Sequence, residues 1–326
     1  MGSSEILITE FAMLNTSTPP EFYGNPGQDG KNIVSNFKKR IRVENIQKSD
    51  EMTMEFDLIG VDAAFANTLR RILISDVPSM AIEKVFIYNN TSIIQDEVLS
   101  HRLGLIPLKA DPRLFKMKPP AEEEAKTEEE MVKEAEGTPE DTIIYEFKVR
   151  CRKNMDTNVL SKAIKPIARP GQNEIGLVHD DILVAKLRPG HEIDIKLYAV
   201  KGYGRDHAKF SPVATAFYRL LPEIKLLKPV SGEAALRLQS CFSPDVIGIK
   251  KDKAYVKDAR NDACSRNVFR HDDLKDCVEM TKVRDHFIFS IESVGAVPPE
   301  ELVPMAFDVI IAKCDYFIDI LEKCNE

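Results

Sequence analysis

Residues 66–78, ANTLRRILISDVP, combine a helical apolar pattern with two adjacent arginines. At about 100° per residue, one side of the predicted helix gathers the apolar residues Phe65, Leu69, Ile72 and Leu73. The opposite side carries Asn67, Arg71 and Ile74, with Ala63 beside them and Arg70 at the border. Arginine among small and apolar residues is typical of binding surfaces, whereas a solvated helix with two soluble arginines is the alternative interpretation. The composition of this helix alone does not decide between a binding surface and a solvated helix.

The bulk composition is that of an ordinary globular chain. The 326 residues are 43% hydrophobic and 30% charged, which is enough for one large or two ordinary domains. No run approaches the roughly 18–20 apolar residues that a membrane helix needs. The first 20 residues lack a basic region followed by an apolar segment and a cleavage site. We therefore expect neither a membrane span nor a signal peptide.

The cysteines are scattered along the chain, at Cys151, Cys241, Cys264, Cys277, Cys314 and Cys324. None forms a C-x-x-C pair, and no histidine lies at zinc-finger spacing from two of them. This pattern predicts no metal centre and favours free thiols in a reducing, intracellular compartment.

The net charge of −7 is unevenly distributed. Residues 122–141 hold ten acidic residues and two lysines, so this segment alone sums to −8 and the rest of the chain carries +1. Because the acidic run has almost no apolar stripe, we expect a mobile insertion. The remaining chain has no basic stripe that would track nucleic acid, which makes direct nucleic-acid binding an improbable function.

Several segments alternate as half-buried strands do. Met54, Phe56 and Leu58 alternate with Glu55 and Asp57, and the same pattern predicts strands at residues 145–151, 193–197 and 287–291. Residues 81–90 also have the composition of a strand. Asp62 and Asp96 are placed to cap helices, and Gly104 suits the left-handed residue after the second one. Strands are numerous and show no regular βαβ rhythm, so the predicted fold class is α+β.

A long helix is predicted at residues 298–324, with an unusually wide apolar face. One side holds Val303, Ala306, Phe307, Ile310, Cys314, Phe317, Ile318 and Leu321, and Leu302, Val309 and Ile320 widen it to about half of the circumference. Such a helix is either sunk in its own core or packs on its own domain and on a partner chain.

Motifs for catalysis are missing. There is no phosphate-binding G-x-x-x-x-G-K-[S/T] loop, and the G-x-G of residues 201–207 lacks a third glycine, so we interpret Gly202 and Gly204 as a turn. His179, Asp180 and Asp181 could ligate a metal in principle, but adjacent residues seldom converge on one ion. No nucleophile elbow is present. The sequence therefore indicates a protein without catalytic, cofactor-binding or metal-binding residues.

Three segments, residues 62–112, 180–222 and 283–302, resemble the α-like subunits of cellular RNA polymerases, in the expected order. HAKFSPVATAFYRLLP at residues 207–222 is most similar to the branch of larger α-like subunits shared by polymerases I and III. The polymerase II branch typically carries a cysteine cluster in its inserted domain, where this chain has only Cys151.

The resemblance implies a discontinuous dimerisation domain, residues 38–79 and 206–326, and an inserted, mainly β domain, residues 80–205, with an acidic loop at 119–141. Residues 1–37 are expected to form an irregular extension. The implied function is that of a non-catalytic scaffold in the nucleus and nucleolus, supporting transcription of ribosomal, 5S and transfer RNA. The implied partners are a smaller α-like subunit, the second-largest catalytic subunits and small assembly subunits, with DNA contacted only through the complex.

The resemblance also assigns two surfaces. The surface for the second-largest subunit would comprise Asn67, Arg70, Arg71, Ile74, His101 and Arg102. The heterodimer surface would comprise Phe65, Leu69, Ile72, Phe289, Val303, Phe307, Ile310, Phe317 and Leu321. Two alternatives stay open: a polymerase II-type paralogue, and a stand-alone metal-dependent enzyme that uses the loop of His179, Asp180 and Asp181.

Overall fold

The computed structural model describes residues 7–8, 13–14, 30–119, 128–152, 155–167, 169–172 and 175–325. The chain divides into two compact units. The first unit holds the described residues up to 46, together with residues 56–67 and 218–289, and the second holds residues 47–55, 68–217 and 290–326. Within the described residues, no helix is long and apolar enough to cross a membrane.

One four-stranded sheet draws its strands from distant parts of the sequence. Its order is β13 (Val213–Leu226), β16 (Val278–Ser293), β4 (Thr53–Ile59) and β3 (Arg42–Lys48). The predicted alternation in β4 is confirmed for Met54, Phe56 and Leu58, which are all buried. Within the first unit, Phe56 stacks on Phe289 with 5.2 Å between ring centroids. The alternation was wrong for Asp57, which is only 1% exposed.

A second four-stranded sheet is antiparallel and lies entirely in the second unit. Its order is β5 (Pro78–Asn90), β12 (Glu192–Tyr203), β7 (Thr142–Arg150) and β9 (Ile164–Pro166). In the register, Ile195 lies opposite both Ile87 and Phe147, so apolar side chains of neighbouring strands share one face. The predicted strands in these segments are thereby confirmed.

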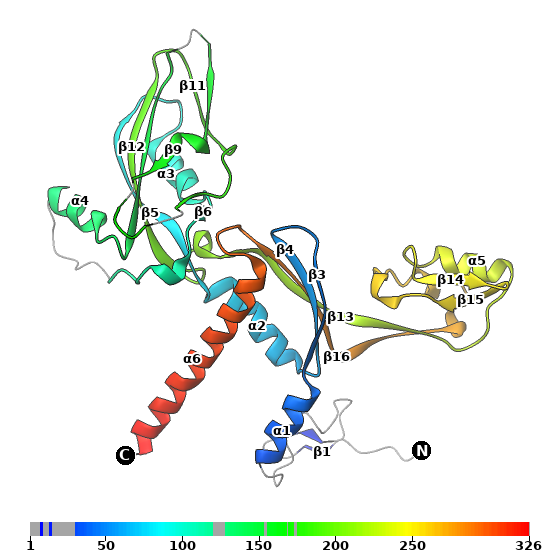
Figure 1. Ribbon diagram of the computed structural model, residues 1–326. Helices are drawn as coiled ribbons and strands as arrows, with labels where there is room; N and C mark the ends of the chain where they lie inside the picture. Colours follow the sequence, from blue (N-terminus) through cyan, green and yellow to red (C-terminus); the bar gives the residue numbers. More distant parts are fainter. Residues whose placement is uncertain are drawn as a thin grey trace. The chain divides into compact units, whose positions relative to one another are not determined.

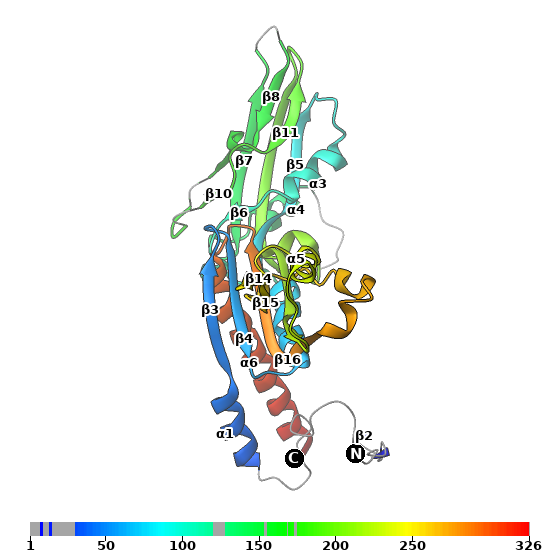
Figure 2. The ribbon, with the colours of Figure 1, turned by 90° about the vertical axis from the view of Figure 1, so that its right-hand side faces the viewer.

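Shorter elements complete the second unit. Helix α3 (Asp96–Gly104) packs against β5 and β11 (Leu183–Leu187), as Figure 2 shows, and buries Leu99 and Leu103. Strand β8 (Thr157–Leu160) pairs with β11, and β6 (Leu108–Lys109) pairs with β10 (Gly176–Leu177). The short 3₁₀ turns are η1 (Pro112–Leu114), η2 (Ser161–Ala163) and η3 (Ala208–Phe210).

Two expected helix boundaries were wrong. Asp96 is the first residue of α3 and not its cap, since the N-cap position is Gln95, and Asp96 instead accepts a hydrogen bond from Asn90 Nδ2 at 2.7 Å. Gly104 lies inside the helix and is buried, while Leu105 follows with a right-handed backbone. Gly104 is therefore not a left-handed residue after the helix, and a Cβ there would meet only ordinary contacts, the nearest at 3.5 Å from the Ile82 carbonyl oxygen.

In the first unit, residues 227–277 fold into a small subdomain between β13 and β16 (Figure 1). Its elements are α5 (Glu233–Ser240), β14 (Ile247–Lys250), β15 (Lys253–Val256), η4 (Ala259–Asn261), η5 (Asn267–Arg270) and η6 (Lys275–Cys277). Leu238, Val246 and Val268 are fully buried in one core. The segment is thus a packed element and not a long loop.

A helix begins within the segment of residues 1–37 that was expected to be irregular. Helix α1 (Gly30–Arg40) occupies its last part, and Lys38, Lys39 and Arg40 stabilise its final turn through the helix dipole. Before it, β1 (Leu7–Ile8) pairs with β2 (Met13–Leu14). The domain boundaries near residues 80 and 205 stay a prediction.

The acidic segment is partly ordered, contrary to the expected mobile insertion. Helix α4 (Glu128–Glu136) buries Ala135 against Ile144 and Tyr198. Glu136 forms an ion pair of 2.9 Å with Lys196 of β12. Lys118 also donates to the Ala135 carbonyl at 3.1 Å, and Arg169 donates to the Glu136 carbonyl at 2.9 Å. These contacts come from residues distant in the sequence, so the sparse apolar pattern did not predict the helix. Residues 120–127 lie outside the described residues.

Candidate interaction surfaces

Helix α2 (Ala63–Ser75) places the two arginines of the opening segment at different depths. Leu69 and Leu73 are fully buried and Ile72 is 5% exposed, which confirms the predicted core face. Arg71 is exposed, whereas Asn67, Arg70 and Ile74 are half-buried. The helix thus has one outward guanidinium, that of Arg71, which makes no ion pair with the described part of the chain.

Ile74 borders an apolar hollow of about 430 Å³ within the second unit. Its lining is rich in small residues: Ser79, Gly204, Ala208, Ser211, Ala214, Ala216 and Ala296. Gly204 is required there, because a Cβ at this position would lie 2.1 Å from the carbonyl oxygen of Ile74. Gly202, by contrast, belongs to β12 and not to a turn. Small side chains let the backbone of another molecule approach closely.

His101 borders a neighbouring hollow of about 350 Å³. Its ring lies 6.5 Å from that of His207, and Lys209 lies on the wall of both hollows. The Lys209 ammonium donates to the Ile82 carbonyl at 2.9 Å and pairs with Glu83. The structure therefore brings Ile74 and His101 to two adjoining hollows, which the sequence did not reveal.

Arg102 has a structural role within the chain that the sequence did not predict. Its guanidinium donates to the carbonyl oxygens of Leu183 at 2.6 Å and Val184 at 3.3 Å, which fastens α3 to β11. Much of its hydrogen-bonding capacity is already used inside the chain. Arg102 is nevertheless exposed, so the rest of its guanidinium can still face a partner.

Helix α6 (Pro299–Asn325), drawn in red in Figure 1, is buried at its start and exposed along its second half. Leu302 and Ala306 are fully buried, and Val303, Phe307 and Ile310 are half-buried. Every residue from 311 to 324 is exposed, although this stretch includes Ile311, Tyr316, Phe317, Ile318, Ile320 and Leu321. Phe317 and Leu321 are each 62% exposed. The wide apolar face is therefore not sunk in the core of its own chain.

Lys313 anchors the exposed half of α6 by an ion pair with Asp76, at the end of α2. Burial acts to raise the pKa of Asp76, but the hydrogen bond and charge of Lys313 outweigh it and lower the pKa. This pair adds one contact between the exposed half of α6 and the residue that follows α2.

Three residues of the predicted heterodimer surface are buried in their own chain. Leu69 and Phe289 are fully buried, and Ile72 is 5% exposed. Their side chains therefore have almost no exposed surface that a partner could contact. Their apolar character serves the core, which sequence periodicity cannot distinguish from an interface. Phe65 is half-buried and lies edge-to-face with Phe37, at 6.2 Å between centroids.

The proposed metal loop has no suitable geometry. His179, Asp180 and Asp181 are exposed, and no group of three potential ligands gathers anywhere in the described ranges. The backbone carbonyl of His179 accepts a hydrogen bond of 2.6 Å from Ser161 Oγ, so the loop is fastened to η2. Nothing in the described geometry supports the metal-dependent enzyme.

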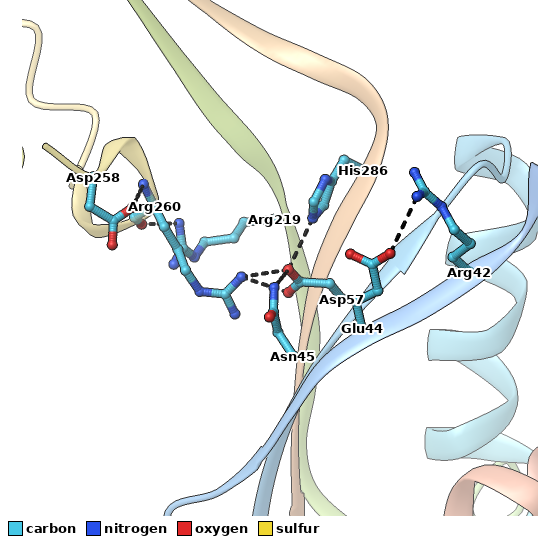
Figure 3. A network of polar contacts seen from close by, with 8 residues as sticks. All are labelled: Arg42, Glu44, Asn45, Asp57, Arg219, Asp258, Arg260 and His286. Carbon is cyan, nitrogen blue, oxygen red and sulfur yellow. Dashed lines mark hydrogen bonds and ion pairs between the residues drawn. The ribbon is translucent and has the colours of Figure 1, made fainter. Parts of the chain in front are cut away.

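A buried polar network in the first unit centres on Asp57 (Figure 3). Its carboxylate accepts hydrogen bonds from Arg260 at 2.6 and 2.8 Å and from Asn45 at 2.7 Å, and His286 Nε2 lies 3.0 Å away. Arg219 donates to the Arg260 carbonyl at 2.9 Å. Burial acts to raise the pKa of Asp57, but the hydrogen bonds from Arg260, Asn45 and His286 outweigh it and hold the pKa below its ordinary value.

Comparison with known proteins identifies the class to which this architecture belongs. Residues 55–314 match the family model of the RNA polymerase Rpb3/Rpb11 dimerisation domain, and the chain belongs to this family. The α+β fold class and the resemblance to α-like polymerase subunits are thereby confirmed.

Relatives in several organisms carry a more specific name. The chain is 47% identical to the mouse DNA-directed RNA polymerases I and III subunit RPAC1, over 98% of this chain and 95% of the relative. It is 41% identical to the protein of the same name in Saccharomyces cerevisiae, over 96% and 97%. Identity falls to 30% with subunit 3 of polymerases II, IV and V of Arabidopsis thaliana, over 80% and 85%. The polymerase II-type alternative is therefore less supported.

Proposed function

We propose that this chain is the non-catalytic scaffold subunit shared by DNA-directed RNA polymerases I and III. Identity above 40% over nearly the full length of relatives with that name carries the proposal. It would act in the nucleus, including the nucleolus, in the synthesis of ribosomal, 5S and transfer RNA. Small assembly subunits complete its set of partners, and DNA is reached only through the complex.

The exposed second half of α6 is the proposed binding surface for the smaller α-like subunit. Burying a large apolar side chain stabilises a complex by roughly 1.5–3 kcal/mol, and α6 offers several such side chains in one row. Phe307 and Ile310 continue the same helix where it enters the core. Heterodimerisation would thus extend an apolar face that the chain itself covers only at the start of α6.

The proposed docking surface for the second-largest subunit combines Arg71 with the two hollows beside Ile74 and His101. Arginine suits this role, because its planar head makes several directed hydrogen bonds while its stem packs on apolar surface. The small side chains of the larger hollow add room for a bulky apolar anchor from the partner.

Gentle affinity purification of the full chain from nuclear extract, with quantification of every large polypeptide, tests the proposal. We expect the two largest subunits of both polymerases I and III, with one small α-like chain in equal amount. Recovery of polymerase II subunits alone would move the assignment to the paralogue. Recovery of no polymerase subunit would refute the proposed function.

A further inference from the structure

A third hollow, of about 420 Å³, lies within the first unit and away from the proposed polymerase contacts in the sequence. It is lined by Arg219, Leu220 and Pro222 of β13, by Arg260, Asn261, Asp262, Ala263 and Cys264 of the η4 loop, and by Lys282 of β16. Arg219 and Lys282 are exposed cations, whereas Asp262 is only 5% exposed. The hollow therefore combines a basic rim with a buried acid.

The carboxylate of Asp262 is buried without compensation. Neither of its oxygens has a hydrogen-bond partner within the part of the chain that the structure describes. Asp57, which is 1% exposed, accepts hydrogen bonds from three neighbouring side chains. An unpaired buried charge is costly, so a site that retains one points to a donor supplied from outside the chain.

The loop that carries Asp262 is held firmly in place. The Asp262 amide donates to the Ala259 carbonyl at 3.1 Å, and the Ala263 amide donates to Ser243 Oγ at 3.0 Å. On the other side, the guanidinium of Arg260 is bound to Asp57. These contacts hold the backbone on both sides of Asp262 in place, and they leave its side-chain torsions able to present the carboxylate to the hollow.

We propose that this hollow binds a segment of a partner polypeptide that carries a basic and an acidic side chain. The basic side chain, a lysine or arginine, would donate to both oxygens of Asp262, and the acidic side chain would lie between Arg219 and Lys282. Leu220, Pro222 and Ala263 would pack on the aliphatic stem of the basic residue. A segment with only one charge would be repelled by either the rim or the acid, so both charges are required.

Site-specific photo-crosslinking in the purified complex tests the site. A benzoylphenylalanine residue at position 220 should crosslink to a partner peptide that contains both a basic and an acidic residue. Asp262→Asn should lower the yield at least tenfold, and Lys282→Glu should lower it as well. Asp272→Asn is the matched control, because its side chain is 97% exposed and lies in the same subdomain. Absence of a crosslink from position 220, or an unchanged yield with Asp262→Asn, would overturn the proposal.

Thermal unfolding of the full chain without partners provides the second readout. Asp262→Asn should raise the midpoint by a few degrees, since it removes an uncompensated buried charge. A lower midpoint would mean that Asp262 stabilises its own chain, and the binding role would then be wrong. The site does not depend on polymerase membership, because the identity of the crosslinked chain is read out separately from the purification above.

Discussion

One guanidinium nitrogen of Arg260 contacts both carboxylate oxygens of Asp57, at 2.6 and 2.8 Å, although the two residues are 203 positions apart. Asp57 belongs to β4, and Arg260 belongs to η4 of the small subdomain. The contact therefore ties the loop of the subdomain to the sheet within the first unit. His286 and Asn45 complete the set of donors, so the carboxylate is enclosed on several sides.

We expect Asp57→Ala to lower the free energy of unfolding by about 3 kcal/mol, because it leaves the half-buried guanidinium of Arg260 without its counter-charge and Asn45 and His286 without their acceptor. Denaturant unfolding of the full chain measures this change. Glu44→Ala is the control, since Glu44 pairs with Arg42 on the surface and should contribute only a small fraction of that amount. Equal effects of the two substitutions would contradict the central role of Asp57.

Stability should depend on pH through the same carboxylate. The folded-state pKa of Asp57 is lowered below the usual 3.8, so its contribution is fully present above the unfolded pKa and is lost as pH falls through the folded pKa. We expect the unfolding free energy of the unsubstituted protein to decrease as the pH drops below about 4. The unfolding free energy of Asp57→Asn should decrease less steeply over the same range. Acid titrations of the two proteins, followed by circular dichroism, compare the slopes. Identical slopes would exclude Asp57 as a source of the acid sensitivity.

Phe317→Asp should abolish pairing with the smaller α-like subunit, because it would place a charge inside the apolar contact. The substitution should not unfold the chain, since Phe317 is 62% exposed. Tyr88→Asp is a matched control, because Tyr88 has the same exposed fraction and lies on β5. Co-expression and size-exclusion chromatography measure pairing. If Phe317→Asp pairs at normal affinity, α6 is not the dimer contact.

Arg71→Ala should weaken capture of the second-largest subunit about tenfold and leave pairing with the smaller subunit unchanged. The reason is that Arg71 is exposed on α2, opposite the residues that the core buries. Arg42→Ala removes another exposed arginine, whose side chain is 63% exposed, and should have no effect. Quantitative pull-down measures both partners. Loss of pairing with normal capture of the large subunit would reverse the assignment of the two surfaces.

The sequence predicted features that depend on local periodicity. The strands around Met54 and Phe147 and the buried face of α2 follow from alternation or helical spacing. The same reasoning failed for Asp57, because the partners that allow its burial lie 12, 203 and 229 residues away. It also could not separate Phe289, which is fully buried, from Phe317, which is exposed. Apolar character alone does not tell whether the covering surface belongs to the same chain.

The adjoining hollows beside Ile74 and His101 were equally hidden from the sequence. Their walls combine residues of α2, β5, α3 and the η3 region, which meet only after folding. The role of Arg102 was missed for a similar reason, since the carbonyl oxygens that it binds are 81 and 82 residues away. The resemblance to a known family predicted the two interaction surfaces. The structure then distinguishes the predicted residues whose side chains are exposed from those that are buried.

The exposed second half of α6 affects the solubility and turnover of the chain before it joins a complex. Tyr316, Phe317, Ile318 and Leu321 are exposed. If the smaller subunit binds there, as proposed, a newly made copy would display them to the solvent until that subunit covers them. Such an orphan would be prone to self-association and would be a ready client for chaperones and proteolysis. The amount of this chain in the cell would then depend on the amount of the smaller α-like subunit, and the two chains would accumulate in equal numbers.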